Sequence, residues 1–94
     1  MYNHTLLIRF NEGTSEENRH DVLEGLRGLE HEIPDIRSLR AEFNIGAATS
    51  YDLILMVQFD DLAGYQNYGP HEAHQKLIKD LIQPYVGEFA SIQF

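Results

Sequence analysis

The feature that most constrains this chain is the order of its periodic segments, in which strand patterns flank helix patterns twice within 94 residues. The clearest strand covers residues 51–59, where apolar side chains alternate with a second, partly apolar set. The clearest helix covers residues 16–31, where apolar residues recur at intervals of three and four. The predicted elements are strand 3–10, helix 16–31, strand 36–47, strand 51–59, a short helix after Asp60 or Asp61, helix 70–83 and strand 86–94.

Capping residues and prolines set the ends of the predicted helices. Thr14 followed three positions later by Glu17 matches a capping box, and Pro34 stops the first helix. Gly69-Pro70 interrupts the second helical region, with Pro70 placed as the first residue of a new helix. Pro84 is expected to end that helix before the last strand begins.

The connection at residues 47–50 is short, so the strands on either side of it should pair as a hairpin. The order is then β-α-β-β-α-β, the α+β arrangement of ferredoxin-like folds, with an antiparallel sheet covered by helices on one face. We expect one domain over residues 1–94, because nothing in the sequence resembles a linker or a low-complexity segment.

Composition argues against several functional classes. A net charge of −8 with only seven Lys and Arg residues argues against nucleic acid as a partner. Cysteine is absent, which excludes disulfides, thiolate metal ligands and cysteine nucleophiles. No glycine-rich phosphate loop is present, and we expect no cofactor. Neither a membrane-spanning run nor a leader pattern is present, so we expect a soluble, cytoplasmic protein without a membrane partner.

Apolar residues on both sides of the predicted sheet suggest self-association. Two helices cover only one face of a four-stranded sheet, yet Leu7, Ile54 and Met56 have the parity opposite to the larger apolar set. Each side chain left in water would forgo on the order of 2 kcal/mol, much of which packing against a twofold copy recovers. We therefore expect a homodimer with Leu7, Ile54 and Met56 at its interface. The alternative is that these are scattered exposed apolar residues, which are common.

The segment from Tyr65 to His74 places phenol and imidazole groups around the expected helix break. His71 falls in the first turn of the new helix, where the helix dipole disfavours a protonated ring, so it could act as a general base. His4 shares its strand face with the apolar residues expected under the helices. We expect His71, Tyr65 and His4 to converge as candidate catalytic residues, and the alternative is that they only hold local hydrogen bonds. The expected lining of the pocket around them is Tyr68, His74, Leu6 and Ile8.

A metal site is a further alternative. His71 and His74 lie three positions apart on one helical face and could ligate a metal together with His4. Zinc sites of this kind need further carboxylate or imidazole ligands in defined positions, and Glu72 points away from this face. We therefore predict no metal site.

These features together resemble the stress-responsive A/B barrel (Dabb) family of dimeric α+β barrels, over nearly the whole chain. The last family motif is Tyr-x-x-His-Pro-x-His, of which this sequence keeps Tyr65 and His71 but has Tyr68-Gly69 in place of His-Pro. The other features that carry the resemblance are His4 in HTLLIRF, Ile33-Pro34, Tyr51-Asp52 and Phe59-Asp60-Asp61.

The resemblance implies a dimer whose central barrel is formed by two facing sheets, with a pocket between sheet and helices in each subunit. In plant polyketide-cyclase relatives, residues matching His4, Tyr65 and His71 surround that pocket and support cofactor-free cyclisation. The histidine matching His71 would be the base, and the tyrosine would bind or polarise a carbonyl.

Three hypotheses follow. The first is a dimeric domain that binds a small, partly apolar ligand without a strong catalytic activity. The second is a cofactor-free cyclase or lyase type of enzyme with His71 as base and Tyr65 as hydrogen-bond donor. The third is a purely structural oligomer whose interior is filled by side chains. An open cavity bordered by Tyr65, His71 and His4 would favour the first two hypotheses.

Overall fold

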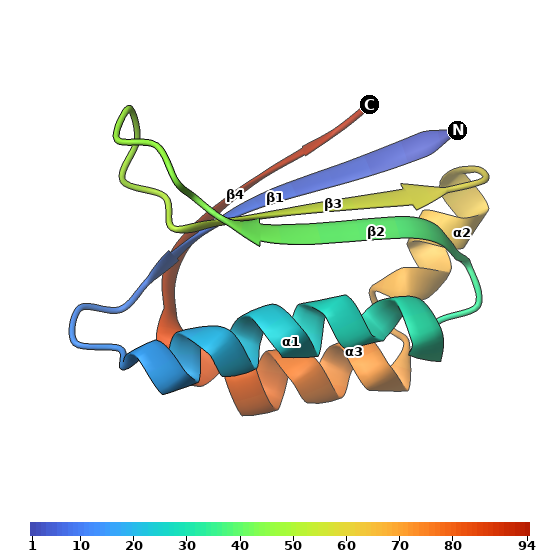
Figure 1. Cartoon of the computed structure of the whole chain (residues 1–94). Helices are drawn as coiled ribbons and strands as arrows, with labels where there is room; N and C mark the ends of the chain where they lie inside the picture. Colours follow the sequence, from blue (N-terminus) through green and yellow to red (C-terminus); the bar gives the residue numbers. More distant parts are fainter.

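The structure is a computed structural model that describes all of residues 1–94, and its elements follow the expected β-α-β-β-α-β order (Figure 1). The strands are β1 (Tyr2–Phe10), β2 (Ile36–Phe43), β3 (Leu53–Phe59) and β4 (Val86–Gln93). The helices are α1 (Glu16–Glu32), α2 (Leu62–Tyr68), α3 (Glu72–Leu77), the π-helical turn η1 (Ile78–Ile82) and α4 (Gln83–Tyr85). Figure 1 shows α1 and α3 side by side beneath one face of the sheet.

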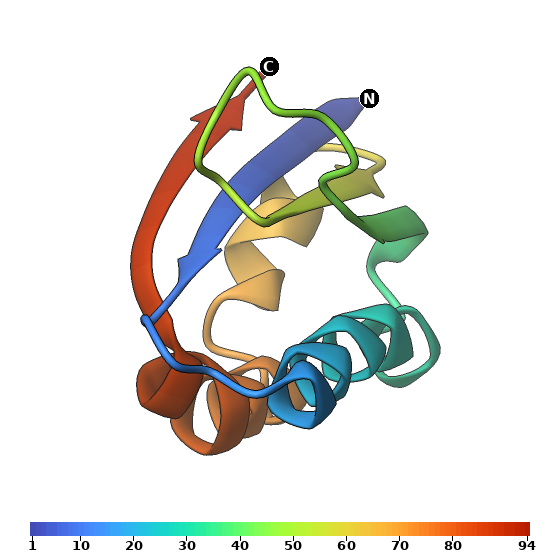
Figure 2. The same cartoon turned by 60° about the vertical axis from the view of Figure 1, so that its left-hand side comes forward.

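The sheet is antiparallel and has the strand order β2-β3-β1-β4. The central strand β1 pairs with β3 on one side and with β4 on the other, so the first and last segments of the chain are neighbours. Figure 2 shows β4 curving along β1 at one edge of the sheet. The predicted ferredoxin-like fold is therefore confirmed. The register pairs His4 with Gln93, which brings two polar side chains to the same face of the sheet.

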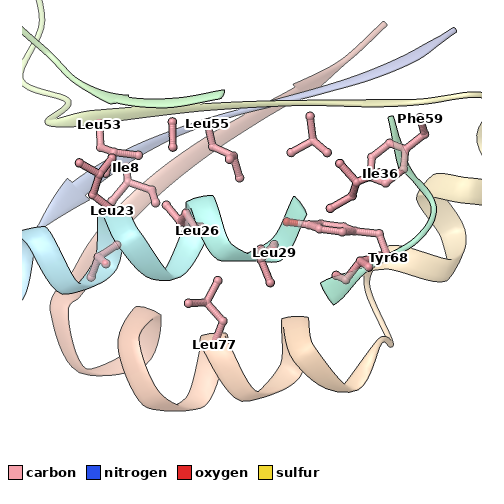
Figure 3. Close-up of a cluster of buried hydrophobic side chains, with 14 of the residues drawn as sticks. Ile8, Leu23, Leu26, Leu29, Ile36, Leu53, Leu55, Phe59, Tyr68 and Leu77 are labelled. Carbon is pink, nitrogen blue, oxygen red and sulfur yellow. The ribbon is translucent and has the colours of Figure 1, made fainter. Parts of the chain in front are cut away.

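The core lies between the sheet and the helices (Figure 3). Alternate residues of β1 and β3 meet the apolar stripe of α1, as the two periodicities predict. Burying such a side chain fully stabilises the fold by about 1.5–3 kcal/mol. The side chains that are almost fully buried include Ile8, Leu53, Leu55, Val57 and Phe59 from the sheet, with Val22, Leu29 and Ile33 from α1 and its C-cap.

The first helix begins at Glu16, as predicted, but its N-cap is not the residue that the capping-box pattern indicates. Ser15 is the N-cap, and its hydroxyl accepts a hydrogen bond from the Asn18 N–H at 3.1 Å. Thr14 instead donates its hydroxyl to the Asn11 carbonyl at 2.7 Å and closes the preceding turn. The prediction of Thr14 as the cap was wrong because the turn after β1 uses this side chain.

The second helical region also differs from the prediction at both ends. Pro70 lies in a turn, and His71 is the N-cap of α3. At the other end, Pro84 lies inside α4 and does not stop the helix. The preceding turn η1 is π-helical, with the Gln83 N–H bonded to the Ile78 carbonyl five residues back. Pro84 therefore occupies the first turn of a new helical segment, where its missing N–H is not required.

The strand predicted over 36–47 ends at Phe43, and the strand predicted from residue 51 begins at Leu53. Asn44 still donates its backbone N–H to the Asp52 carbonyl at 2.8 Å, and its side chain bonds to two backbone groups of the loop that follows. It donates to the Tyr51 carbonyl and accepts from the Gly46 N–H, each at 2.7 Å. Ile45, which falls within the predicted strand, is instead fully exposed in the loop.

The face of the sheet opposite the helices (the outer face) carries the apolar residues singled out in the sequence. Leu7 and Ile54 are paired neighbours on β1 and β3, and Met56 lies beside them with 38% of its surface exposed. Ile92 and Phe94, near the end of the chain, are 69% and 75% exposed. No helix is long and apolar enough to cross a membrane.

Candidate functional site

A cavity of about 470 Å³ lies between the sheet and the helical region formed by α2, α3 and η1. Sixteen residues line it, and eleven of them are hydrophobic. Its volume falls within the range of about 300–1,000 Å³ that is typical of small-molecule sites. The aliphatic and phenylalanine side chains in its wall are Leu6, Ile8, Leu26, Leu55, Leu77, Ile78, Ile82, Val86 and Phe89.

His4 reaches the cavity because it shares the inward parity of Leu6 and Ile8 on β1. Only 8% of its surface is exposed. The side-chain amide nitrogen of Gln93 donates a hydrogen bond to His4 Nδ1 at 2.8 Å. Because Nδ1 accepts this bond, the single proton of the neutral ring is on Nε2. The His4 ring therefore offers an N–H donor at Nε2.

Tyr65 and Tyr68 come from successive turns of α2 and both line the cavity. The Tyr65 ring centroid is 5.3 Å from that of His4, and the Tyr68 centroid is 5.9 Å from it. Phe59 packs edge-on against both tyrosines, which fixes their rings. Figure 3 shows the Tyr68 side chain reaching in from the end of α2 between the sheet and the helices. Burial, and secondarily the nearby Tyr65, raises the pKa of Tyr68 well above its ordinary value, so its hydroxyl stays protonated.

His74 completes the polar end of the cavity from α3. Its Nδ1 lies 2.9 Å from the Gly69 carbonyl, which can only accept, so Nδ1 carries the proton and donates. In the neutral ring Nε2 is then unprotonated and can act as an acceptor or a base. The His74 ring packs against Tyr68 at a centroid distance of 4.3 Å. His4 and His74 thus contribute opposite hydrogen-bonding groups, a donor and an acceptor, to one cavity.

His71 does not line this cavity. As the N-cap of α3, it accepts a hydrogen bond at Nδ1 from the Ala73 N–H at 3.1 Å. Of the three residues expected to converge, the structure brings His4 and Tyr65 together and leaves His71 outside. The expected lining residues Tyr68, His74, Leu6 and Ile8 all border the cavity.

Burial is the main cause that lowers the pKa of His4 below its ordinary value, and the nearby His74 lowers it further. The neutral ring is therefore favoured, in agreement with a Gln93 amide that donates to it. No group of three or more His, Cys, Asp or Glu residues is arranged to hold a metal ion. His4, His71 and His74 are accordingly not brought together as a group of metal ligands.

The sequence did not single out several residues that border the cavity or orient its side chains. Gln93 orients His4, but its role depends on the register between β1 and β4, which no local pattern reveals. Phe89 and Ser91 lie on the cavity side of β4 and could have been found from the strand alternation. Ile78 and Ile82 both face the cavity across the π-helical turn.

Solved structures with this fold are found in bacteria and plants. A dimeric ferredoxin-like protein of unknown function from Thermobifida fusca is 24% identical, with a TM-score of 0.87 over 99% of this chain and 88% of that one. A Dabb family protein with a ferredoxin-like fold from Mesorhizobium loti is 19% identical, with a TM-score of 0.86 over 99% and 93%. The hydroxynitrile lyase from Passiflora edulis is 12% identical, with a TM-score of 0.87 over 99% and 90%. At these identities the likeness shows the fold alone.

Comparison with curated protein sequences finds no significant match. The family model described as the stress-responsive A/B barrel domain matches residues 2–94, almost the entire chain. The fold, with its uncovered sheet face and its cavity beneath the other face, agrees with that match. The chain therefore belongs to the stress-responsive A/B barrel domain (Dabb) family.

Proposed function

We propose that this chain works as a homodimer in which each subunit binds a small, largely apolar molecule between its sheet and helices. The observation that carries the binding proposal is the cavity of about 470 Å³, with aliphatic walls and one polar end. A few convergent polar groups in an apolar cavity are typical of sites that orient a ligand. A purely structural oligomer would have no need for unfilled space beside His4, Tyr68 and His74.

The binding proposal is tested by filling the cavity. Ile78 is a half-buried lining residue, so Ile78→Trp should occupy the space with limited strain. Its exposed neighbour Lys79 does not line the cavity, and Lys79→Trp is the matched control. A thermal-shift screen of small aromatic and aliphatic compounds on the unmodified chain supplies the ligand. We expect Ile78→Trp to abolish its binding and Lys79→Trp to retain it. Equal binding by both variants would place the ligand elsewhere and overturn the proposal.

The dimer proposal rests on the outer face. Its apolar centre lies between polar rows, an arrangement typical of protein interfaces. At one end, Ser38 donates to the Gln58 side chain, which in turn donates to Asn3. At the other end, Arg9 pairs with Glu88 at 2.6 Å. Structural neighbours such as the Thermobifida fusca protein are described as dimeric.

A charge introduced on the outer face, in the apolar part of its edge strand β4, tests the dimer. Ile92 is 69% exposed in the isolated chain, so Ile92→Glu should leave the subunit folded. Buried against a second copy, the same carboxylate would lack a partner and should dissociate the dimer. Leu62→Glu on α2 places the same charge at an exposed apolar site away from this face. Sedimentation equilibrium at micromolar concentration should show a monomer for the first variant and a dimer for the second. A monomeric unmodified chain would refute the proposal.

A second candidate function, cofactor-free proton transfer, is favoured by the fixed ring orientations of His4 and His74. Unprotonated Nε2 of His74 could remove a proton from a substrate hydroxyl or from carbon next to a carbonyl. The oxyanion that develops could accept hydrogen bonds from Nε2–H of His4 and from the Tyr68 hydroxyl. In a hydroxynitrile, loss of the hydroxyl proton drives cleavage of the bond to cyanide, which then accepts the proton. The hydroxynitrile lyase from Passiflora edulis has this fold.

Two histidine variants distinguish this assignment from the one expected from the sequence. His74→Asn removes the proposed base, whereas His71→Asn keeps a side chain that can cap α3. The assay is the release of benzaldehyde from mandelonitrile, followed by absorbance. We expect His74→Asn to lower the rate by about 10²-fold or more and His71→Asn to leave it nearly unchanged. The opposite result would identify His71 as the base. If the unmodified chain releases benzaldehyde no faster than the uncatalysed reaction does, lyase activity on this substrate is refuted.

A further inference from the structure

We infer that the cavity selects ligands whose polar head is uncharged and both donates and accepts hydrogen bonds, such as an alcohol or a phenol. This inference rests on the proposed binding function and specifies the ligand class for the same cavity. It depends on three observations: the absence of charged side chains from the lining, the presence of two imidazoles in that lining, and the opposite hydrogen-bonding roles that their partners give them.

The lining contains no Lys, Arg, Asp or Glu side chain. A ligand that enters with a carboxylate, phosphate or ammonium group would lose its hydration and find no opposite charge. Burial of an unpaired charge is costly, whereas a hydroxyl needs only hydrogen-bond partners. The net charge of −8 on the chain further disfavours anions. The nearest helix lysine in sequence to His74, Lys76, is exposed and pairs with Asp80 at 3.5 Å.

The two rings specify the hydrogen-bonding pattern of the head group. The Gln93 amide holds His4 with its proton on Nε2, and the Gly69 carbonyl holds His74 with an unprotonated Nε2. A hydroxyl can accept from the first ring and donate to the second. A carboxylate has no proton to donate to His74, and an ammonium has no lone pair to accept from His4. The tautomers therefore disfavour both ions and favour a neutral group with both functions.

A protonated His4 ring would help to admit an anion, and the surroundings of this ring oppose its protonation. The titratable groups that face His4 are His74, Tyr65 and Tyr68. None of them supplies a negative charge near neutral pH, because the Tyr68 hydroxyl stays protonated and its neighbours are a phenol and an imidazole. Burial and the proximity of His74 lower the pKa of His4, so the ring remains neutral at pH 8.

The test uses three compounds that share a phenylpropyl skeleton: 3-phenylpropan-1-ol, 3-phenylpropanoate and 3-phenylpropylammonium. Dissociation constants are measured at pH 8 from NMR titration of the full-length chain, following resonances of cavity residues. We expect the alcohol to bind at least about tenfold more tightly than either ion. An ion that binds as tightly as the alcohol would overturn the charge selection and leave the binding function standing. If none of the three perturbs the cavity residues, the binding function fails and this inference fails with it.

A matched pair of variants tests whether the uncharged lining causes the preference for the alcohol over the carboxylate. Gln66 is exposed at the cavity rim, so Gln66→Arg adds a cation that a bound carboxylate can reach. Gln83→Arg adds the same charge at an exposed site outside the lining. We expect the first variant to narrow or reverse the preference for the alcohol over the carboxylate, and the second to leave it unchanged. An equal effect of both would show that overall charge, and not the lining, sets the preference, which overturns the inference.

Discussion

Two glycines of α1 offer a test of how closely the helices pack over the cavity. At Gly25, a Cβ atom would lie 2.6 Å from Cδ1 of Leu81 and 2.7 Å from Cδ1 of Leu77. Carbon atoms normally approach to about 3.5–4.0 Å, so an added methyl group would overlap both leucines by about 1 Å. At Gly28, one turn along the same helix, nothing lies within 4 Å of the added atom. Gly28→Ala is therefore the control for Gly25→Ala.

The expected free energies follow from two terms. Replacing a helical glycine by alanine stabilises the helix by about 1 kcal/mol, and this term applies at both sites. Overpacking costs about 1–3 kcal/mol and applies only at Gly25. Gly28→Ala should therefore raise the free energy of unfolding by about 1 kcal/mol. Gly25→Ala should lower it by about 0–2 kcal/mol, so that the two variants differ by about 1–3 kcal/mol.

The assay is urea denaturation followed by circular dichroism, at one fixed protein concentration because a dimer would link stability to concentration. Leu77 also lines the cavity, so a displaced α3 should weaken ligand binding in Gly25→Ala but not in Gly28→Ala. If Gly25→Ala stabilises the protein as much as Gly28→Ala does, the helices are not in the contact described, and the wall of the cavity is misplaced.

Three further predictions concern other parts of the chain. The pKa of His4 is lowered on folding, so the unfolded chain binds the proton more readily than the folded chain does. The free energy of unfolding should therefore have its full value above about pH 6.5 and decrease as the pH is lowered below about 6.5. Urea titrations at several pH values should show a weaker dependence in a His4→Gln variant. Ser15→Ala should lower the free energy of unfolding by about 1 kcal/mol in the same assay, and Thr14→Ala should lower it clearly less, because only Ser15 caps α1. A larger loss for Thr14→Ala than for Ser15→Ala would show that Thr14 is the cap. Asp52→Ala should cost about 1–2 kcal/mol because the Phe10 N–H loses its acceptor at 2.8 Å, and Asp52→Asn, which keeps an oxygen there, should recover part of that loss.

The architecture was predictable because each element carries its own periodic signal. The two sides of the core correspond to two of these signals. One side contains the alternating residues around Leu53 and Leu55, and the other contains the helically spaced residues around Leu26 and Leu29. Element ends were less predictable because they depend on single side chains with several possible partners. The alternation alone would continue the strand past Asn44, but the side-chain amide of Asn44 bonds to backbone groups of the loop that follows.

The composition of the candidate site was harder to predict than the fold. The sequence singled out both His71 and His74, and the choice between them depends on where α3 starts. With Pro70 as the first helical residue, His71 would lie within the helix; as the actual N-cap, it turns its Nδ1 to the backbone. The ring orientations of His4 and His74 depend on Gln93 and on the Gly69 carbonyl, two partners that only the folded chain brings into contact.

The proposed dimer and the proposed site share one structural element, strand β4. Its residues from Gly87 to Ile92 are exposed, and β1 is its only partner in the sheet. On the cavity side, Phe89 is 64% exposed and borders the opening, while Gln93 orients His4. On the outer side, Ile92 faces the surface that a second copy would cover. Packing of that surface would hold the strand, and with it Gln93, in place. The tautomer of His4, on which both the charge selection and the proton transfer depend, would then be maintained by dimer contacts made through the opposite face of the sheet.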